Sequence, residues 1–269
     1  MRLDDVRGFV FDVDGTLVHR AGAEIHVQPG AAEVLARIRA SGRPLAIFTN
    51  GSHEAPEAFA AGLRSVGLDV ADGELLTPLR SVRHYLRMQG LDGPVLLFAT
   101  EEAREYLIRE GMRVLDGEES LEADAVFVAH ADVVDFAQLE RAARLVLGGA
   151  RLLTGSYAPA YAGANGPIFS RGAMVTAALA KATGARPVVV GKPSRAALRT
   201  VSECLGTAPR HLAVIGDDVT MDVALGRMGG ARTILVGTGI TGTVALDHLT
   251  ERRRPDAVVA GIADLLDWL

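Results

Sequence analysis

Short apolar runs rich in β-branched residues alternate with helical patterns along most of the 269-residue chain, and this alternation constrains the fold more than any other feature. Strands that alternate with helices predict βαβ units and a mainly parallel sheet, so the expected fold class is α/β. In such sheets ligands bind at the carboxyl ends of the strands. The expected strands are 6–11, 44–48, 95–98, 125–128, 151–153, 188–190, 212–215, 233–236 and 257–259.

Apolar side chains at helical spacing predict helices between these strands. One stripe runs through Ala31, Val34, Leu35 and Ile38. A second runs through Phe136, Leu139, Ala143 and Val146, and a third closes the chain with Ile262, Leu265, Leu266 and Leu269. The glycine-rich segment 157–172 has little periodicity, so we expect either an irregular functional loop or a pair of short twisted strands.

Composition excludes several classes of protein. The net charge is −5, so we expect no nucleic-acid partner. No stretch has the length of a membrane span, and the first residues lack the apolar core of a signal peptide. The single cysteine, Cys204, lies in a helical pattern and is expected to be buried. One cysteine cannot form an internal disulfide, which fits a reducing compartment, so we expect a cytoplasmic protein without a membrane partner.

The first expected strand ends in two aspartates, Asp12 and Asp14, followed by Gly15 and Thr16. Two carboxylates at the end of a buried strand repel each other and lose hydration, and a divalent cation would relieve both costs. Mg²⁺ prefers one or two carboxylates together with phosphate oxygens and water, so the pair indicates a metal-assisted site for phosphate chemistry. A plain turn is the alternative. A calcium loop is not, because Thr16 and Ala23 stand where further ligands belong.

Three other expected strands also end in polar residues. Strand 44–48 is followed by Thr49 and Asn50, and strand 188–190 by Gly191 and Lys192; strand 212–215 is followed by Asp217 and Asp218, with Asp222 further on. We expect all four strands in one parallel sheet, so that these side chains meet at one edge. Taken singly, Thr49-Asn50 and Asp217-Asp218 could be helix caps and Lys192 an exposed lysine.

Together these residues resemble the motifs of the haloacid dehalogenase-like superfamily. Asp12 to Leu17 resembles the first motif, Thr49-Asn50 the second, Lys192 the third and Gly216-Asp217 to Asp222 the fourth. The chain is most similar to the NagD-like subclass (subclass IIA), whose members carry a large α/β cap of the C2 type between the second and third motifs. Thr49 and Lys192 are 143 positions apart, which leaves room for such a cap.

The resemblance implies a Mg²⁺-dependent phosphatase that acts on a small phosphorylated metabolite through an aspartyl-phosphate. It implies Asp12 as the nucleophile, Asp14 as the general acid and base, and Lys192 as the cation that neutralises the phosphoryl group. Thr49 and the amides near Asn50 would bind the same oxygens. Mg²⁺ would be held by Asp12, by the backbone carbonyl of Asp14 and by Asp217. Asp222 would support the water shell of the metal without touching the ion, and Asp218 could contact the metal ligands from behind.

The resemblance also implies a Rossmann-like core of residues 1–78 and 187–269 and a cap of residues 79–186. The cap departs from the usual pattern, because the segment Thr154–Ala158 holds Gly155 and lacks an acid, whereas His130-Ala131-Asp132 keeps an acid without the usual glycine. These departures leave the substrate open. The candidates for substrate contact in the cap are Tyr157, Tyr161, Asn165 and Arg171, each of which could instead pack or face solvent.

Two other interpretations remain open. The chain could be a catalytically idle protein that binds a phosphometabolite, or a receiver-like signalling module, although Asp217 follows Lys192 here and receivers place the lysine last. A homodimer is one candidate assembly. The segment 237–242 matches Gly-x-Gly-x-x-Gly, but Asp256 precedes the next strand instead of ending it, so we expect no dinucleotide site.

Overall fold

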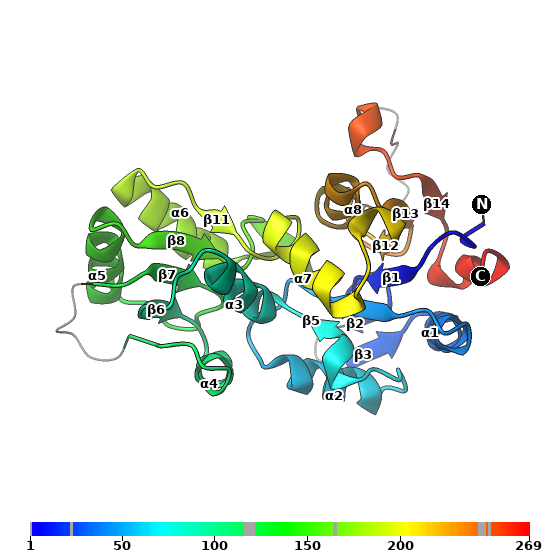
Figure 1. Cartoon of the computed structure of the whole chain (residues 1–269), viewed down its shortest axis with the longest axis horizontal. Helices are drawn as coiled ribbons and strands as arrows, with labels where there is room; N and C mark the ends of the chain where they lie inside the picture. Colours follow the sequence, from blue (N-terminus) through cyan, green and yellow to red (C-terminus); the bar gives the residue numbers. More distant parts are fainter. Residues whose placement is uncertain (1, 22–23, 116–121, 164–165, 242–245, 247–248) are drawn as a thin grey trace.

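The computed structural model describes residues 2–21, 24–115, 122–163, 166–241, 246 and 249–269. The described chain forms a six-stranded sheet and a separate four-stranded sheet, together with two short hairpins. Figure 1 shows the six-stranded sheet at one end of the molecule, with both termini beside it, and the four-stranded sheet at the other end. The expected α/β class, with a Rossmann-like core and an inserted cap, is confirmed.

The six-stranded sheet, called the core sheet below, is parallel throughout and has the order β14-β13-β12-β1-β4-β5. Its central strand is buried along its whole length, as expected for a parallel strand covered on both faces. The side chains of Phe9 and Phe11 are fully buried. The strands are β1 (Gly8–Phe11), β4 (Leu45–Phe48), β5 (Leu75–Leu76), β12 (Leu212–Gly216), β13 (Arg232–Val236) and β14 (Ala257–Val259).

The four-stranded sheet, called the cap sheet, is also parallel and has the order β11-β8-β7-β6. Its strands are β6 (Val95–Phe98), β7 (Ala125–Val128), β8 (Arg151–Thr154) and β11 (Val188–Val189). The expectation that the strand before Lys192 shares a sheet with β1, β4 and β12 is wrong, because β11 pairs with β8. We propose that the division into core and cap holds with its second boundary moved from 186/187 to a position after Val189.

Helices connect the strands, and their starts follow the sequence. Ser, Thr or Asp side chains accept a hydrogen bond from the first turn of α3, α4, α5, α6 and α7, which satisfies backbone donors that have no partner within the helix. The helices are α1 (Ala31–Ala40), α2 (Pro56–Ser65), α3 (Pro78–Met88), α4 (Glu101–Arg109), α5 (Phe136–Leu147), α6 (Arg171–Thr183), α7 (Arg195–Leu205) and α8 (Ala224–Gly229).

The remaining elements are short. The antiparallel pair β2 (Val18–Ala21) and β3 (Glu24–Val27) follows β1, and the pair β9 (Ala160–Gly163) and β10 (Gly166–Phe169) lies in the glycine-rich segment. The second pair agrees with the expected twisted strands there. The described residues also form short helical segments of one or two turns: η1 (Asp72–Glu74), η2 (Pro209–His211), η3 (Val219–Val223), η5 (Glu251–Arg253) and η6 (Ile262–Asp267).

Three local expectations are corrected. The final apolar stripe forms the 3₁₀ helix η6 instead of an α-helix. Cys204 is exposed and not buried; its thiol lies 3.5 Å from the backbone oxygen of Gly73. Strands β2, β3 and β5 were not expected, because two to four residues give too short a pattern to recognise.

Candidate functional site

The acidic residues expected at the site meet at the carboxyl edge of the core sheet. Asp12 follows β1, Asp217 follows β12 and Thr49 follows β4, and these three strands are neighbours. Asp12, Asp217 and Asp222 each present a carboxylate oxygen, and these oxygens lie within 4.8 Å of one another. The backbone N–H of Asp12 donates to the carbonyl of Ile215 on β12 at 2.9 Å, which fixes the two strand ends in register.

Lys192 binds this acidic cluster although it follows a strand of the cap sheet. Its Nζ donates to Asp12 Oδ1 at 2.6 Å and to Asp222 Oδ1 at 2.7 Å. The Lys192 side chain is only 3% exposed, so its charge is largely shielded from water and is balanced by these two carboxylates. The ammonium expected at the site is therefore present, but it is delivered from between the two sheets.

Asn50 holds Lys192 in place through the backbone. The Asn50 side chain accepts from the Lys192 N–H at 2.7 Å and donates to the Lys192 carbonyl at 2.8 Å. Thr49 is buried, and its Oγ1 accepts from the N–H of Gly51 at 3.0 Å. The side chain of Asn50 thus positions the lysine, which leaves the Thr49 hydroxyl and nearby backbone amides as the groups that could meet a ligand.

Asp217 is held by a segment that the sequence analysis did not assign to the site. The N–H of Ile240 donates to Asp217 Oδ2 at 2.6 Å, and Thr238 Oγ1 donates to the carbonyl of Gly15 at 2.6 Å. Gly15 has φ +85°, and a Cβ there would collide with the Asp217 carboxylate, so only glycine fits. Gly237 and Gly239 of the discounted glycine pattern lie in this supporting loop, whereas Gly242 lies outside the described residues.

Asp14 lies at the rim of the site and is ion-paired with Arg20. Arg20 on β2 donates through Nε to Asp14 Oδ1 at 2.5 Å. The Asp14 side chain is 51% exposed, so this carboxylate can reach a molecule that enters from solvent. Sequence reasoning missed Arg20, because nothing in the motif marks the hairpin that carries it back to Asp14.

Asp218 and Asp222 organise the turn after β12. Asp218 Oδ1 accepts from the backbone and hydroxyl of Thr220, at 2.6 Å and 2.7 Å, and therefore caps η3. Asp222 Oδ2 accepts from the N–H of Asp218 at 3.2 Å while its other oxygen binds Lys192. Asp218 therefore stands behind the cluster, and Asp222 belongs to it.

Burial dominates the electrostatics of the cluster. It raises the pKa of Asp12 well above the ordinary value although Lys192 opposes this, and Asp222 and Asp217 raise it further. Burial and then Asp222 raise the pKa of Asp217 to about 7. Burial also raises the pKa of Asp222 against the effect of Lys192. Burial alone would lower the pKa of Lys192, but Asp12 and Asp222 outweigh it and raise that pKa, so the ammonium stays charged.

The cluster fits a hard divalent cation. Its three converging donors are carboxylate oxygens, which Mg²⁺ and Ca²⁺ prefer, and it contains no sulfur or imidazole ligand among the described residues. One ammonium cannot neutralise three ionised carboxylates, and burial raises the pKa of each acid because the ionised form lacks hydration there. A cation beside Asp12 and Asp217 would balance the remaining negative charge.

The pKa of Asp217 gives a test of stability against pH. The folded-state pKa of Asp217 is about 7, against an ordinary value of 3.8. Between these two pH values the folded protein keeps the carboxyl proton of Asp217, whereas the unfolded chain has lost it. The stabilisation is present at low pH and is lost as the pH rises towards 7. Without metal, Asp217→Asn should therefore gain unfolding free energy relative to the unmutated protein, by on the order of 2–3 kcal/mol between about pH 5 and about pH 7.5.

Urea unfolding in EDTA at several pH values measures this difference. Asp69→Asn is the control for the loss of one carboxylate, because Asp69 is 89% exposed and lies outside the acidic cluster. A difference for Asp217→Asn that does not change with pH would show that Asp217 titrates normally. Added divalent cation should shrink the Asp217→Asn difference at the higher pH, because the cation stabilises the ionised carboxylate.

The structure places the cap residues proposed for substrate contact in different surroundings. Arg171 donates to Asp132 Oδ1 at 2.8 Å, and His130 Nε2 lies 3.5 Å from the same oxygen. Tyr157 is exposed. Asn165 and the side chain of Tyr161 lie outside the described residues. The structure therefore brings together His130, Asp132 and Arg171, and it keeps Tyr157 at the surface.

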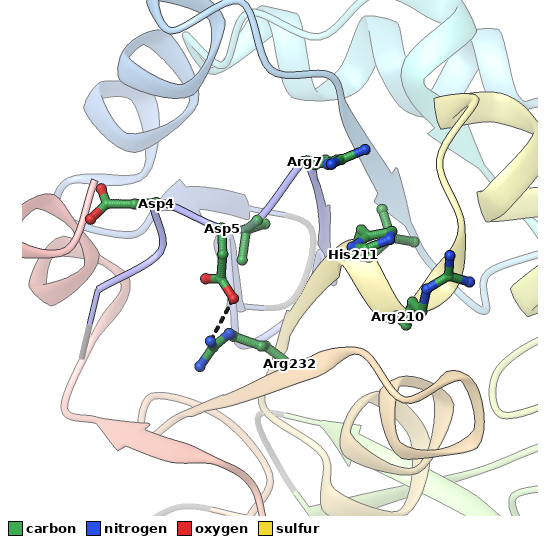
Figure 2. Close-up of a pocket in the computed structure, with 8 residues that line it drawn as sticks. Asp4, Asp5, Arg7, Arg210, His211 and Arg232 are labelled. Atoms are coloured by element: carbon green, nitrogen blue, oxygen red, sulfur yellow. Dashed lines mark hydrogen bonds and ion pairs between the residues drawn. The ribbon is translucent and has the colours of Figure 1, made fainter.

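A cavity of about 420 Å³ lies at the opposite, amino-terminal edge of the core sheet. Figure 2 shows Asp5 paired with Arg232 there, at 2.6 Å, with His211 and Arg210 beyond. None of the residues expected at the functional site lines this cavity, so it is separate from the acidic cluster. Among the described residues, no helix combines the length and the apolar character needed to cross a lipid bilayer.

A parallel core sheet that carries buried carboxylates and a buried lysine at its carboxyl edge, joined to a second parallel sheet, is the architecture of a capped α/β enzyme with an acidic site. The sequence matches the model of the haloacid dehalogenase-like hydrolases over residues 9–113 and a second, HAD-hydrolase-like model over residues 189–265. The chain belongs to the haloacid dehalogenase-like hydrolases, in the branch that contains NagD, as the motifs predict.

Similar proteins cover nearly the whole chain. The dihydroxyacetone phosphatase of Corynebacterium glutamicum is 28% identical over 96% of this chain and 90% of its own length. The ribonucleotide monophosphatase NagD of Escherichia coli is 26% identical over 97% of this chain and 98% of its own. The solved structure of a p-nitrophenyl phosphatase from Archaeoglobus fulgidus has 29% identity and a TM-score of 0.86, and covers 98% of this chain and 100% of its own.

Proposed function

We propose that the chain is a Mg²⁺-dependent phosphatase that hydrolyses small phosphate monoesters through a phosphorylated Asp12. The observation that carries this proposal is the double ion pair of Lys192 with Asp12 and Asp222 inside the acidic cluster. A receiver-like module no longer fits, because the chain matches a hydrolase family along most of its length. The catalytically idle binding protein remains the alternative that activity assays decide.

Asp12 is the nucleophile because it bonds the Lys192 ammonium and, with 13% of its side chain exposed, is the least buried acid of the cluster. Lys192 stabilises Asp12 as a carboxylate and then neutralises the oxygens of the transferring phosphoryl group. The Thr49 hydroxyl and the adjacent amides bind those oxygens from the neighbouring strand end. Attack by Asp12 forms the aspartyl-phosphate and splits one difficult hydrolysis into two easier steps.

Asp14 is the general acid and base. In the first step its carboxyl donates a proton to the leaving oxygen, and in the second its carboxylate takes a proton from the attacking water. Arg20 orients Asp14 at the rim, where a leaving group would lie. Asp12 and Asp217, with the backbone carbonyl of Asp14, would hold the metal, and Asp222 and Asp218 would support them. When bound, the cation supplies charge stabilisation to the phosphoryl oxygens and to Asp12.

The names of the relatives indicate the range of substrates. They include a dihydroxyacetone phosphatase, a ribonucleotide monophosphatase and a p-nitrophenyl phosphatase. We therefore propose a small phosphorylated metabolite as substrate and an aryl phosphate as a generic test compound. A homodimer and a cytoplasmic location stay predictions from the sequence.

Removal of the metal tests the proposal directly. We expect EDTA to abolish hydrolysis of p-nitrophenyl phosphate and excess Mg²⁺ to restore it, because the acidic cluster carries more negative charge than Lys192 can balance. Release of p-nitrophenol at constant pH is the measurement. Full activity in excess EDTA would remove the metal from the mechanism, and inactivity in Mg²⁺ towards every phosphate monoester would favour the idle binding protein.

A further inference from the structure

A cavity of about 570 Å³, called the seam cavity below, lies between core and cap. It is lined by His53, which follows β4 in the core, by Thr100 and Glu102 at the start of α4, and by His130 and Asp132 after β7. Thr100 Oγ1 donates to the carbonyl of His53 at 2.5 Å, so core and cap touch at its edge. None of these residues has a part in the phosphoryl transfer proposed above.

The seam cavity adjoins the rim of the acidic cluster. His53 follows Thr49 and Asn50 at the carboxyl end of β4, so this wall of the cavity continues from the strand end that borders the acidic cluster. Asp14 protonates the leaving oxygen in the proposed mechanism, so the leaving group must lie on the Asp14 side of the phosphoryl group. The remainder of the substrate therefore extends towards His53 and the cap residues opposite it.

Two imidazoles that line the seam cavity lie edge to face against each other. The ring centroids of His53 and His130 are 5.8 Å apart, and the rings are inclined by 61°. Burial lowers the pKa of His53, and His130 and Arg20 lower it further, against the opposing charges of Asp14 and Glu102. His53 is therefore neutral near pH 7, and a neutral imidazole offers one N–H donor and one nitrogen acceptor.

The charged groups around the imidazoles select against a second anion. Glu102 and Asp132 line the seam cavity, and Arg171 already donates to the Asp132 carboxylate at 2.8 Å, with His130 3.5 Å from the same oxygen. A leaving group with its own carboxylate or second phosphate would meet these acids. None of the described residues that line the cavity is Phe, Tyr or Trp, so they offer no broad aromatic face to a nucleobase. Mixed donors and acceptors suit hydroxyl groups.

We propose that the seam cavity binds a neutral, polyhydroxylated leaving group, such as a short polyol or sugar, and that His130 and Asp132 are the residues that determine this specificity. The proposal rests on the proposed phosphatase function, because it assigns the leaving group of that same reaction. It gives a role to His130, which stands where the family usually has glycine, and to the retained acid Asp132, because both form a polar wall with Arg171.

The test compares kcat/KM for four phosphate monoesters: glycerol phosphate, p-nitrophenyl phosphate, phosphoglycolate and a ribonucleoside 5′-monophosphate. The unmutated protein should prefer glycerol phosphate to phosphoglycolate and to the nucleotide. His130→Ala and Asp132→Asn should each lower kcat/KM for glycerol phosphate by about tenfold, the usual effect of losing one hydrogen bond to a bound hydroxyl. Their kcat/KM for p-nitrophenyl phosphate should stay within about twofold, because that leaving group has no hydroxyl to bind.

His211→Ala is the matched control, because this histidine lies at the opposite edge of the core sheet (Figure 2) and should leave all four values unchanged. Equal retention of all four activities in both variants would overturn the proposal. So would an equal loss on all four, or a preference of the unmutated protein for phosphoglycolate or the nucleotide. Hydrolysis of p-nitrophenyl phosphate by the unmutated protein reports the phosphatase function separately, and its absence would defeat that function first.

Discussion

Asp12→Asn should lower kcat for p-nitrophenyl phosphate by at least about 10³-fold, because the carboxamide cannot act as a nucleophile. The fold should survive. The substitution keeps the shape of the side chain and removes one of three carboxylates that crowd around a single ammonium. Circular dichroism and thermal unfolding should therefore show a folded protein whose stability is close to that of the unmutated one.

A covalent readout separates the nucleophile from a merely structural acid. Brief incubation with labelled substrate followed by acid quenching should trap labelled phosphate on the unmutated protein and none on Asp12→Asn. Asp4→Asn is the control, since Asp4 is 74% exposed at the far edge of the core sheet (Figure 2), and it should keep both turnover and labelling. Turnover by Asp12→Asn at the rate of the unmutated protein would mean that another group attacks the phosphorus.

Lys192→Met should destabilise the metal-free protein by about 3–5 kcal/mol, because it leaves two buried carboxylates without their counter-ion. The methionine fills similar space, so the loss is mainly electrostatic. Lowering the pH should recover part of it, since protonation of Asp12 or Asp222 removes the uncompensated charge. Urea unfolding in EDTA measures the free energy at each pH.

The chain supplies its own control for this experiment, because Lys181 is its only other lysine and is exposed on α6. Lys181→Met should change the unfolding free energy by less than about 0.5 kcal/mol. A double variant, Lys192→Met with Asp222→Asn, should be more stable than Lys192→Met alone. A loss below about 1 kcal/mol for Lys192→Met would show that the ion pairs contribute little to the folded state.

The sequence predicted most of the core sheet because its strands are apolar runs that end in polar residues. β1, β4 and β12 lie where the runs place them, and Asp12, Thr49 and Asp217 follow them as expected. The periodicity of a strand does not show which strand it pairs with, so the sequence could not predict that β11 belongs to the cap sheet. The same limit hid Arg20 and Ile240, whose contacts with Asp14 and Asp217 depend on how a hairpin and a loop return in space.

The prediction that Cys204 is buried was wrong for a related reason. A helical stripe identifies the apolar face of α7, but it does not show where the neighbouring chain leaves the helix edge open, and Cys204 lies at such an edge. Sequence spacing could not mark His53 and His130 as a pair, because they are far apart in sequence and meet only where core and cap touch.

The segment that joins β11 to Lys192 limits how this molecule could be recombined with its relatives. The N–H of Gly191 donates to Gly155 of the cap at 3.0 Å, and the next residue is bonded on both sides by Asn50 of the core. A Cβ at Gly191 would collide with the Gly155 carbonyl and with the Asn50 side chain, so this segment accepts no larger residue. A chimera that exchanges caps should therefore be spliced upstream of Val190, so that the crossing glycine, the lysine and its asparagine clamp are inherited together.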